Sequence, residues 1–89
     1  MKQAITLTIK GRVQNVGFRF SALRKAEELN INGYVKNQID GTVYIEAEGE
    51  PEKLNKFINW CHEGPPAANV QQVNKQEIGI KDYKVFVIK

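Results

Sequence analysis

The 89-residue sequence contains one cysteine, one histidine and three prolines, and it has no long run of apolar residues. The lone Cys61 cannot form an internal disulfide or supply a cysteine-based metal site. The first residues, MKQAITLTIKG, alternate polar and apolar side chains and resemble neither a signal peptide nor a membrane span. These absences predict a cytoplasmic protein that needs no metal, no cofactor and no membrane.

The length predicts one domain over residues 1–89, because two halves would each be too small to bury a core. The formal net charge of +3 is too modest to indicate nucleic acid as a partner. Residues 1–40 nevertheless carry seven basic and three acidic side chains, an excess that would attract a small anion. A solvated, lysine-rich surface explains this excess equally well. Nothing in the pattern demands more than a monomer.

Hydrophobic periodicity predicts five strands and two helices. Apolar residues alternate with polar ones in the first strand, and they recur at helical spacing from Phe18 and again from Pro51. Asp40-Gly41 indicates a hairpin between the second and third strands. The predicted strands cover residues 5–10, 33–39, 42–48, 70–80 and 84–88, and the helices lie between the first and second and between the third and fourth strands.

This order is the split βαβ or ferredoxin-like arrangement, an α+β fold with two helices on one face of a mainly antiparallel sheet. A short C-terminal strand is added to it. In strand 42–48, alternation places Val43, Ile45 and Ala47 toward the helices, and it places Tyr44, Glu46 and Glu48 on a solvated outer face. The fold hosts many functions and does not decide between them.

The stretch GRVQNVGFRF, residues 11–20, joins the first strand to the first helix and suits neither element. Gly11 and Gly17 allow the backbone to curl and to approach a ligand, while the helix start offers unpaired N–H groups and a partial positive charge. Arg19 can add a planar fork that matches phosphate oxygens. Taken alone, this spacing is also that of an ordinary tight turn with a surface arginine, and the bare pattern favours that interpretation.

Asn37 follows two inward-facing positions of the second strand, where an apolar residue would be the default. A right-handed βαβ crossover brings this strand end beside the 11–20 loop. A neutral carboxamide there can hold a water in a fixed direction beside an anion. The alternative is an asparagine that serves only the adjacent turn.

Four motifs together resemble the acylphosphatase family over essentially the whole chain: GRVQNVGFR, YVKNQIDGTVYIEAEG, EGPP and the terminal FVIK. The resemblance implies hydrolysis of the carboxyl-phosphate anhydride of acyl phosphates, with inorganic phosphate as product or inhibitor. Arg19 matches the phosphate-binding arginine of the family, and Asn37 matches its water-positioning asparagine. The implied phosphate-binding loop consists of Val13, Gln14, Asn15, Val16, Gly17, Phe18 and Arg19.

The sequence departs from the family pattern at three asparagines. Asn15 and Asn30 stand where glycine is usual, and asparagine is the residue that best replaces glycine at positive φ. Of these positions, Asn15 is the one that could lower the activity, because it lies in the implied phosphate-binding loop. Asn69 stands where an arginine is common, and we expect it to lie far from both motifs.

Other functions receive less support from the residues. Cys61 and His62 invite a nucleophile-base pair, but adjacent residues on a helix point in different directions. An RNA-binding domain shares the predicted element order, yet strand one lacks aromatic residues on its open face and strand three offers only Tyr44 beside two glutamates. A non-catalytic anion-binding or regulatory module remains the alternative to an enzyme, and Asn15 is its only support.

Overall fold

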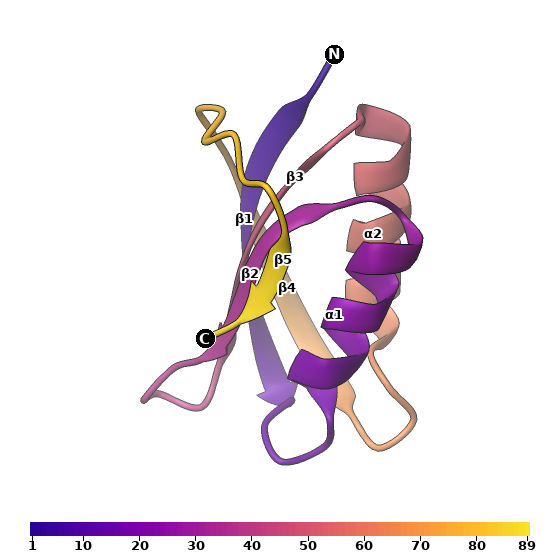
Figure 1. Cartoon of the computed structure of the whole chain (residues 1–89). Coiled ribbons are helices and arrows are strands. Elements are labelled where there is room, and N and C mark those ends of the chain that lie inside the picture. The colour runs from indigo at the N-terminus through magenta and orange to yellow at the C-terminus, as the bar shows by residue number, and fades with distance from the viewer.

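The computed structural model describes the whole chain, residues 1–89, as one β-sheet covered on one face by two helices (Figure 1). This arrangement confirms the predicted α+β, ferredoxin-like fold. Neither helix has the length and apolar character of a membrane-spanning segment. The elements are β1 (Gln3–Arg12), α1 (Phe18–Glu28), β2 (Asn32–Asn37), β3 (Val43–Gly49), α2 (Pro51–Glu63), β4 (Asn69–Ile78) and β5 (Phe86–Ile88).

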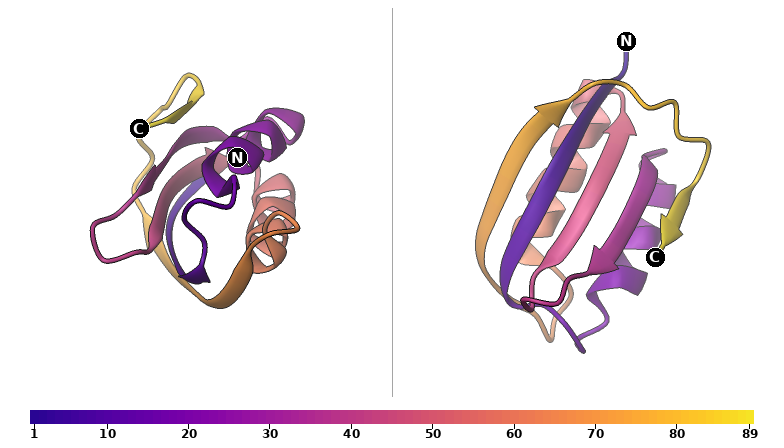
Figure 2. Two further views of the ribbon diagram at one scale, coloured as in Figure 1. Left: turned by 90° about the horizontal axis from the view of Figure 1, so that it is seen from below. Right: turned by 90° about the vertical axis from the view of Figure 1, so that its left-hand side faces the viewer.

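The strands are arranged in the order β4-β1-β3-β2-β5 (Figure 2). All neighbouring strands are antiparallel except β5, which pairs in parallel with β2 at the edge of the sheet. Strands β1 and β2 run in the same direction on either side of β3. Their C-terminal ends, at Arg12 and Asn37, therefore lie at the same end of the sheet, beside the loop that leads into α1 (Figure 2).

The hydrophobic core fills the space between the sheet and the helices. The inward positions predicted for β3 are fully buried, as the alternation requires. Helix α1 buries small alanines, which let its backbone approach the sheet closely, and α2 fills the other half of the layer with larger side chains. The buried residues of these elements are Val43, Ile45 and Ala47 in β3, Phe18, Ala22 and Ala26 in α1, and Leu54, Phe57 and Cys61 in α2.

All five predicted strands differ from the structure by one or two residues at one or both ends. Strand β1 covers residues 3–12 and not 5–10, and β3 covers residues 43–49 and not 42–48. Strand β2 ends at Asn37 and not at residue 39, because the N–H of Gln38 donates to the carbonyl of Thr42 and closes the β2–β3 turn. Gly41 has φ 92° in this turn, as predicted for an Asp-Gly hairpin. Strand β4 covers residues 69–78 and not 70–80, and β5 begins at Phe86 and not at residue 84.

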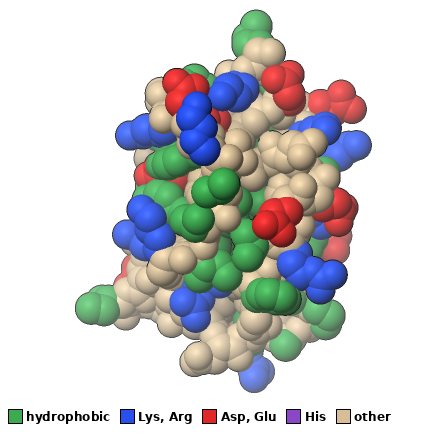
Figure 3. Space-filling view, in the orientation of Figure 1, with side chains coloured by type: hydrophobic (Ala, Val, Ile, Leu, Met, Phe, Trp, Pro, Cys, Tyr) green, Lys and Arg blue, Asp and Glu red, His purple; other side chains and the backbone are tan.

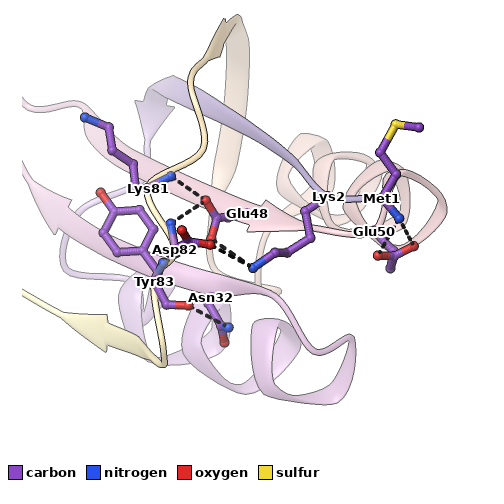
Figure 4. Close-up of polar contacts among 8 residues, drawn as sticks. All are labelled: Met1, Lys2, Asn32, Glu48, Glu50, Lys81, Asp82 and Tyr83. Atoms are coloured by element: carbon purple, nitrogen blue, oxygen red, sulfur yellow. Dashed lines mark hydrogen bonds and ion pairs between the residues drawn. The ribbon is translucent and has the colours of Figure 1, made fainter.

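The prediction of a solvated Glu48 is wrong. The side chain is 1% exposed, because the segment that leads from β4 to β5 passes over it (Figure 4). Its carboxylate accepts the backbone N–H groups of Lys81, Asp82 and Tyr83 at 2.7, 3.1 and 3.0 Å. Lys2 Nζ lies 3.9 Å away and supplies a positive charge. One carboxylate thus fixes the connection that places β5 on the edge of the sheet.

Replacement of Glu48 by alanine is expected to lower the free energy of unfolding by about 2–4 kcal/mol, because three N–H groups lose a charged acceptor and regain water only in part. Glu48→Gln keeps one acceptor oxygen and should lose about half as much. Urea unfolding measures both values, with the exposed Glu77→Ala as the matched control. A loss below about 1 kcal/mol in Glu48→Ala would show that this carboxylate does not hold the segment.

Candidate active site

Helix α1 begins without any side-chain cap. Its N-cap residue is Gly17, with φ 80° and ψ 17°, and its first turn contains no acidic residue. No residue from 13 to 20 donates a backbone hydrogen bond in the turns and loops; the first donor is Ser21, to the Gly17 carbonyl at 3.0 Å. Helix α2, in contrast, starts with Pro51 and carries Glu52 in its first turn. The unpaired N–H groups of α1 therefore form a positive end that an anion can occupy.

Asn15 and Asn30 both have a positive φ, as predicted for asparagines that stand where glycine is usual. Asn15 has φ 62° and Asn30 has φ 57°, both in the left-handed region. Asparagine tolerates this region better than other residues with a Cβ. The loop therefore keeps its curl although Asn15 is not glycine. A Cβ placed on Gly17 would meet no atom within 4 Å, which leaves this part of the backbone open to a ligand.

Gly11 serves another purpose than the predicted approach to a ligand. Its φ is 128°, and a Cβ there would lie 2.2 Å from the carbonyl oxygen of Asn69. The register of β1 and β4 shifts between Lys10 and Gly11, and Asn69 pairs with Arg12. The expectation that Asn69 lies far from both motifs is therefore wrong, because β4 starts beside the end of β1. Glycine is needed at position 11 to admit the neighbouring strand.

Arg19 lies in the first turn of α1, two residues after Gly17. Its side chain is exposed and takes part in no ion pair or hydrogen bond with the protein. An unpaired guanidinium at an uncapped helix N-terminus adds a bidentate donor to the same positive region.

Asn37 is the last residue of β2 and shares a strand face with the fully buried Val35. Its carboxamide faces the helix side, as predicted. The Oδ1 atom is buried and is the only buried side-chain polar atom in the protein that has no hydrogen-bond partner. Such an atom costs stability, and a protein that retains one commonly uses it.

The side chain of Gln14 connects the loop before α1 to the turn that follows Asn37, and the sequence reasoning missed this role. Its Nε2 donates to the carbonyl oxygens of Gln38 and Thr42 at 2.8 and 3.0 Å. These carbonyls belong to the β2–β3 turn that directly follows Asn37. Gln14 therefore sets the position of the 13–17 loop relative to Asn37. No periodicity or spacing in the sequence could have revealed this contact, because it joins two loops.

The loop, the helix start and the end of β2 enclose a shallow cavity of about 220 Å³. Two predicted loop residues do not line it, since Gln14 points to the β2–β3 turn and Val16 packs against the core. Two further residues that the sequence reasoning missed do line it, Phe20 and Ile88. Arg19 is its only ionisable side chain. The lining consists of Val13, Asn15, Gly17, Phe18, Arg19, Phe20, Asn37 and Ile88.

Cys61 and His62 do not form a reactive pair. Cys61 is completely buried in the stripe of α2 that faces the sheet, whereas His62 is exposed. Burial raises the pKa of the Cys61 thiol far above its usual range, so the thiol stays protonated.

The open face of the sheet carries a tyrosine cluster that the sequence reasoning also missed. The hydroxyls of Tyr44 and Tyr83 both donate to the Glu46 carboxylate, and the Tyr34 ring packs against both tyrosines. Burial raises the pKa of Tyr44 and Tyr83, and Glu46 raises it further, so both hydroxyls remain donors. These rings pack on one another around a negative charge, an arrangement that does not favour base stacking.

The fold and the cavity together describe a small α+β protein with a backbone cradle suited to a compact anion. Comparison of the sequence and structure with known proteins shows to which family the chain belongs. The family model of acylphosphatase matches residues 5–88. An acylphosphatase from Thermococcus kodakarensis is 45% identical over 82 residues, which cover 89% of this chain and 90% of the relative. One from a Nocardioides species is 44% identical over 77 residues, covering 86% and 78%.

A solved acylphosphatase structure from Coxiella burnetii superposes with a TM-score of 0.96 and is 42% identical. The alignment covers 99% of this chain and 93% of that one. The chain belongs to the acylphosphatase family. The prediction of an enzyme of this family is thereby confirmed, and the alternative of a non-catalytic anion-binding module is not favoured.

Proposed function

We propose that the protein hydrolyses acyl phosphates to a carboxylate and inorganic phosphate, with Arg19 and Asn37 as its catalytic residues. Arg19 and the backbone N–H groups of the 13–19 loop hold the phosphoryl group, and Asn37 orients the attacking water. One observation carries this proposal: Asn37, whose buried Oδ1 has no hydrogen-bond partner, lines the same cavity as Arg19 and the uncapped start of α1.

Binding uses groups that are already in place before the substrate arrives. The N–H groups at the start of α1 and the Arg19 guanidinium are hydrogen-bond donors without acceptors in the protein. Preorganised donors stabilise the charge on the equatorial phosphoryl oxygens as the transition state forms, and they need no rearrangement. Phosphoryl transfer through a loose transition state depends mainly on such positioning and charge stabilisation.

The attacking water donates one hydrogen bond to Asn37 Oδ1, which aims an oxygen lone pair at phosphorus. The new P–O bond forms as the bond between phosphorus and the acyl oxygen breaks, and the departing carboxylate takes the bonding electrons. The water proton passes to a phosphoryl oxygen, because no carboxylate or imidazole lines the cavity to receive it. The products are one carboxylate and one inorganic phosphate.

The chemistry requires no general acid. A carboxylate is a stable anion at neutral pH, since the pKa of a carboxylic acid lies near 4. An alkoxide from a phosphate monoester would instead need protonation as it leaves. Arg19, the only ionisable group of the lining, is permanently charged and cannot act as that acid.

The expected result is phosphate release from benzoyl phosphate and acetyl phosphate, unchanged by EDTA, with little release from the monoester p-nitrophenyl phosphate. The reason is the absence of an acid for the alkoxide and of carboxylate, histidine or cysteine metal ligands around the cavity. A colorimetric assay measures the inorganic phosphate that is released from each of the three substrates. Equal rates on both substrate classes, or loss of activity with EDTA, would contradict the proposed function.

The wider setting of the activity is part of the same proposal. Residues 1–89 act as one monomeric domain on a small-molecule substrate, and inorganic phosphate competes with that substrate for the cradle. The protonated, buried thiol of Cys61 is compatible with the reducing conditions of the cytoplasm, where we place the protein.

A further inference from the structure

The cavity has an apolar side that the cradle chemistry does not use. Phe20 and Ile88 line the cavity, yet they remain 59% and 39% exposed. Neither belongs to the buried core. We call these two residues the apolar rim. Exposed large apolar side chains beside a polar binding site commonly contact the apolar part of a ligand.

The backbone fixes the position of Ile88 on this side. Ile88 pairs with Val35 in the parallel ladder of β2 and β5, and the N–H of Lys89 donates to the Val35 carbonyl at 2.9 Å. Ile88 shares a strand face with the buried Phe86, as Asn37 shares one with Val35. Asn37 and Ile88 therefore both project toward the helix side at the same end of two adjacent strands.

Phe20 approaches from the other element of the cavity, the first turn of α1. The guanidinium carbon of Arg24, four residues further along the helix, lies 5.9 Å from the centroid of the Phe20 ring. This cation–π contact restricts the ring although the ring is exposed. Figure 3 shows hydrophobic side chains gathered across the middle of the face formed by α1 and β5.

We propose that the apolar rim binds the acyl group of the substrate and selects acyl phosphates with an aromatic or branched apolar acyl group over acetyl phosphate. This inference rests on the proposed function. When the phosphoryl group of the bound substrate lies against the 13–19 loop, its acyl group extends along Phe20 and Ile88. The side chains of Phe20 and Ile88 are themselves apolar, so contact with them favours an apolar acyl group.

The rim should act on binding and not on the chemical step. Apolar contacts remote from phosphorus are equal in the ground state and the transition state, so they lower KM and leave kcat almost unchanged. The methyl group of acetyl phosphate is too short to cover the Phe20 ring, whereas a phenyl group can cover it.

The test compares kcat and KM for benzoyl phosphate and acetyl phosphate in the wild type and in Phe20→Ala, Phe20→Leu and Ile88→Ala. We expect Phe20→Ala to lower kcat/KM for benzoyl phosphate about tenfold, mainly through KM, and to lower it much less for acetyl phosphate. Phe20→Leu should restore part of the preference. Val85→Ala is the matched control. Val85 directly precedes β5 and is 62% exposed, but it does not line the cavity.

Two results would overturn the inference in different ways. If the wild type hydrolyses both substrates and the benzoyl-to-acetyl ratio is the same in Phe20→Ala and Ile88→Ala, the rim is not the acyl site and the proposed function stands. If the wild type hydrolyses neither substrate, the proposed function fails and the inference fails with it. Thermal unfolding confirms that each variant is folded, as expected for side chains outside the core.

Discussion

Replacement of Arg19 by alanine is expected to lower the turnover of acyl phosphates by roughly 10²–10³-fold and to weaken the binding of inorganic phosphate. The side chain is the only charged group in the cavity, and no partner in the protein competes for its donors. Its loss removes a bidentate donor from the charge that develops on the phosphoryl oxygens. Steady-state kinetics and the inhibition constant of phosphate measure the two effects.

Two further variants make this result specific. Arg19→Lys should restore little activity, because an ammonium is a point charge and cannot reproduce the planar fork. Arg12→Ala removes a positive charge near the same loop, but Arg12 does not line the cavity. Its effect should be small and should vanish at high salt, as expected for a long-range field. Near-normal kinetics in Arg19→Ala would make Arg19 an ordinary surface residue.

Replacement of Asn37 by alanine is expected to lower kcat by roughly 10²-fold or more while the affinity for inorganic phosphate stays nearly unchanged. The reason is that the carboxamide orients the water and does not hold the phosphoryl group. An equal loss of phosphate affinity and turnover would make Asn37 a binding residue and would contradict the proposed mechanism. Asn59→Ala, an exposed asparagine of α2, is the matched control.

The stability of the Asn37 variant provides an independent check. Oδ1 of Asn37 is buried without a partner, so its removal relieves an unsatisfied acceptor. Asn37→Ala should therefore unfold at the same temperature as the wild type or slightly above it, whereas its activity falls. Asn37→Asp places a negative charge beside the bound anion and should also weaken phosphate binding, most strongly at low salt.

Local signals were sufficient for most of the fold. The alternation in β3 and the helical spacing in α1 predicted their buried faces correctly, because side-chain direction follows directly from backbone period. Strand ends were less well predicted, since β2 ends where the Gln38–Thr42 hydrogen bond closes the turn. Glu48 shows the limit of period alone: its position on the outer face was predicted, but the segment that covers it comes from residues 81–83.

For the candidate site, the sequence by itself determined which residues are available. The glycine and asparagine of the loop, the uncapped helix start and Arg19 are all local features, and a local backbone preference is enough to create them. Only the tertiary structure decided how these features meet Asn37. The Gln14 contact to the β2–β3 turn and the placement of Ile88 beside Phe20 join segments that are 24 or more residues apart. Such contacts depend on strand order and register, which a linear pattern does not contain.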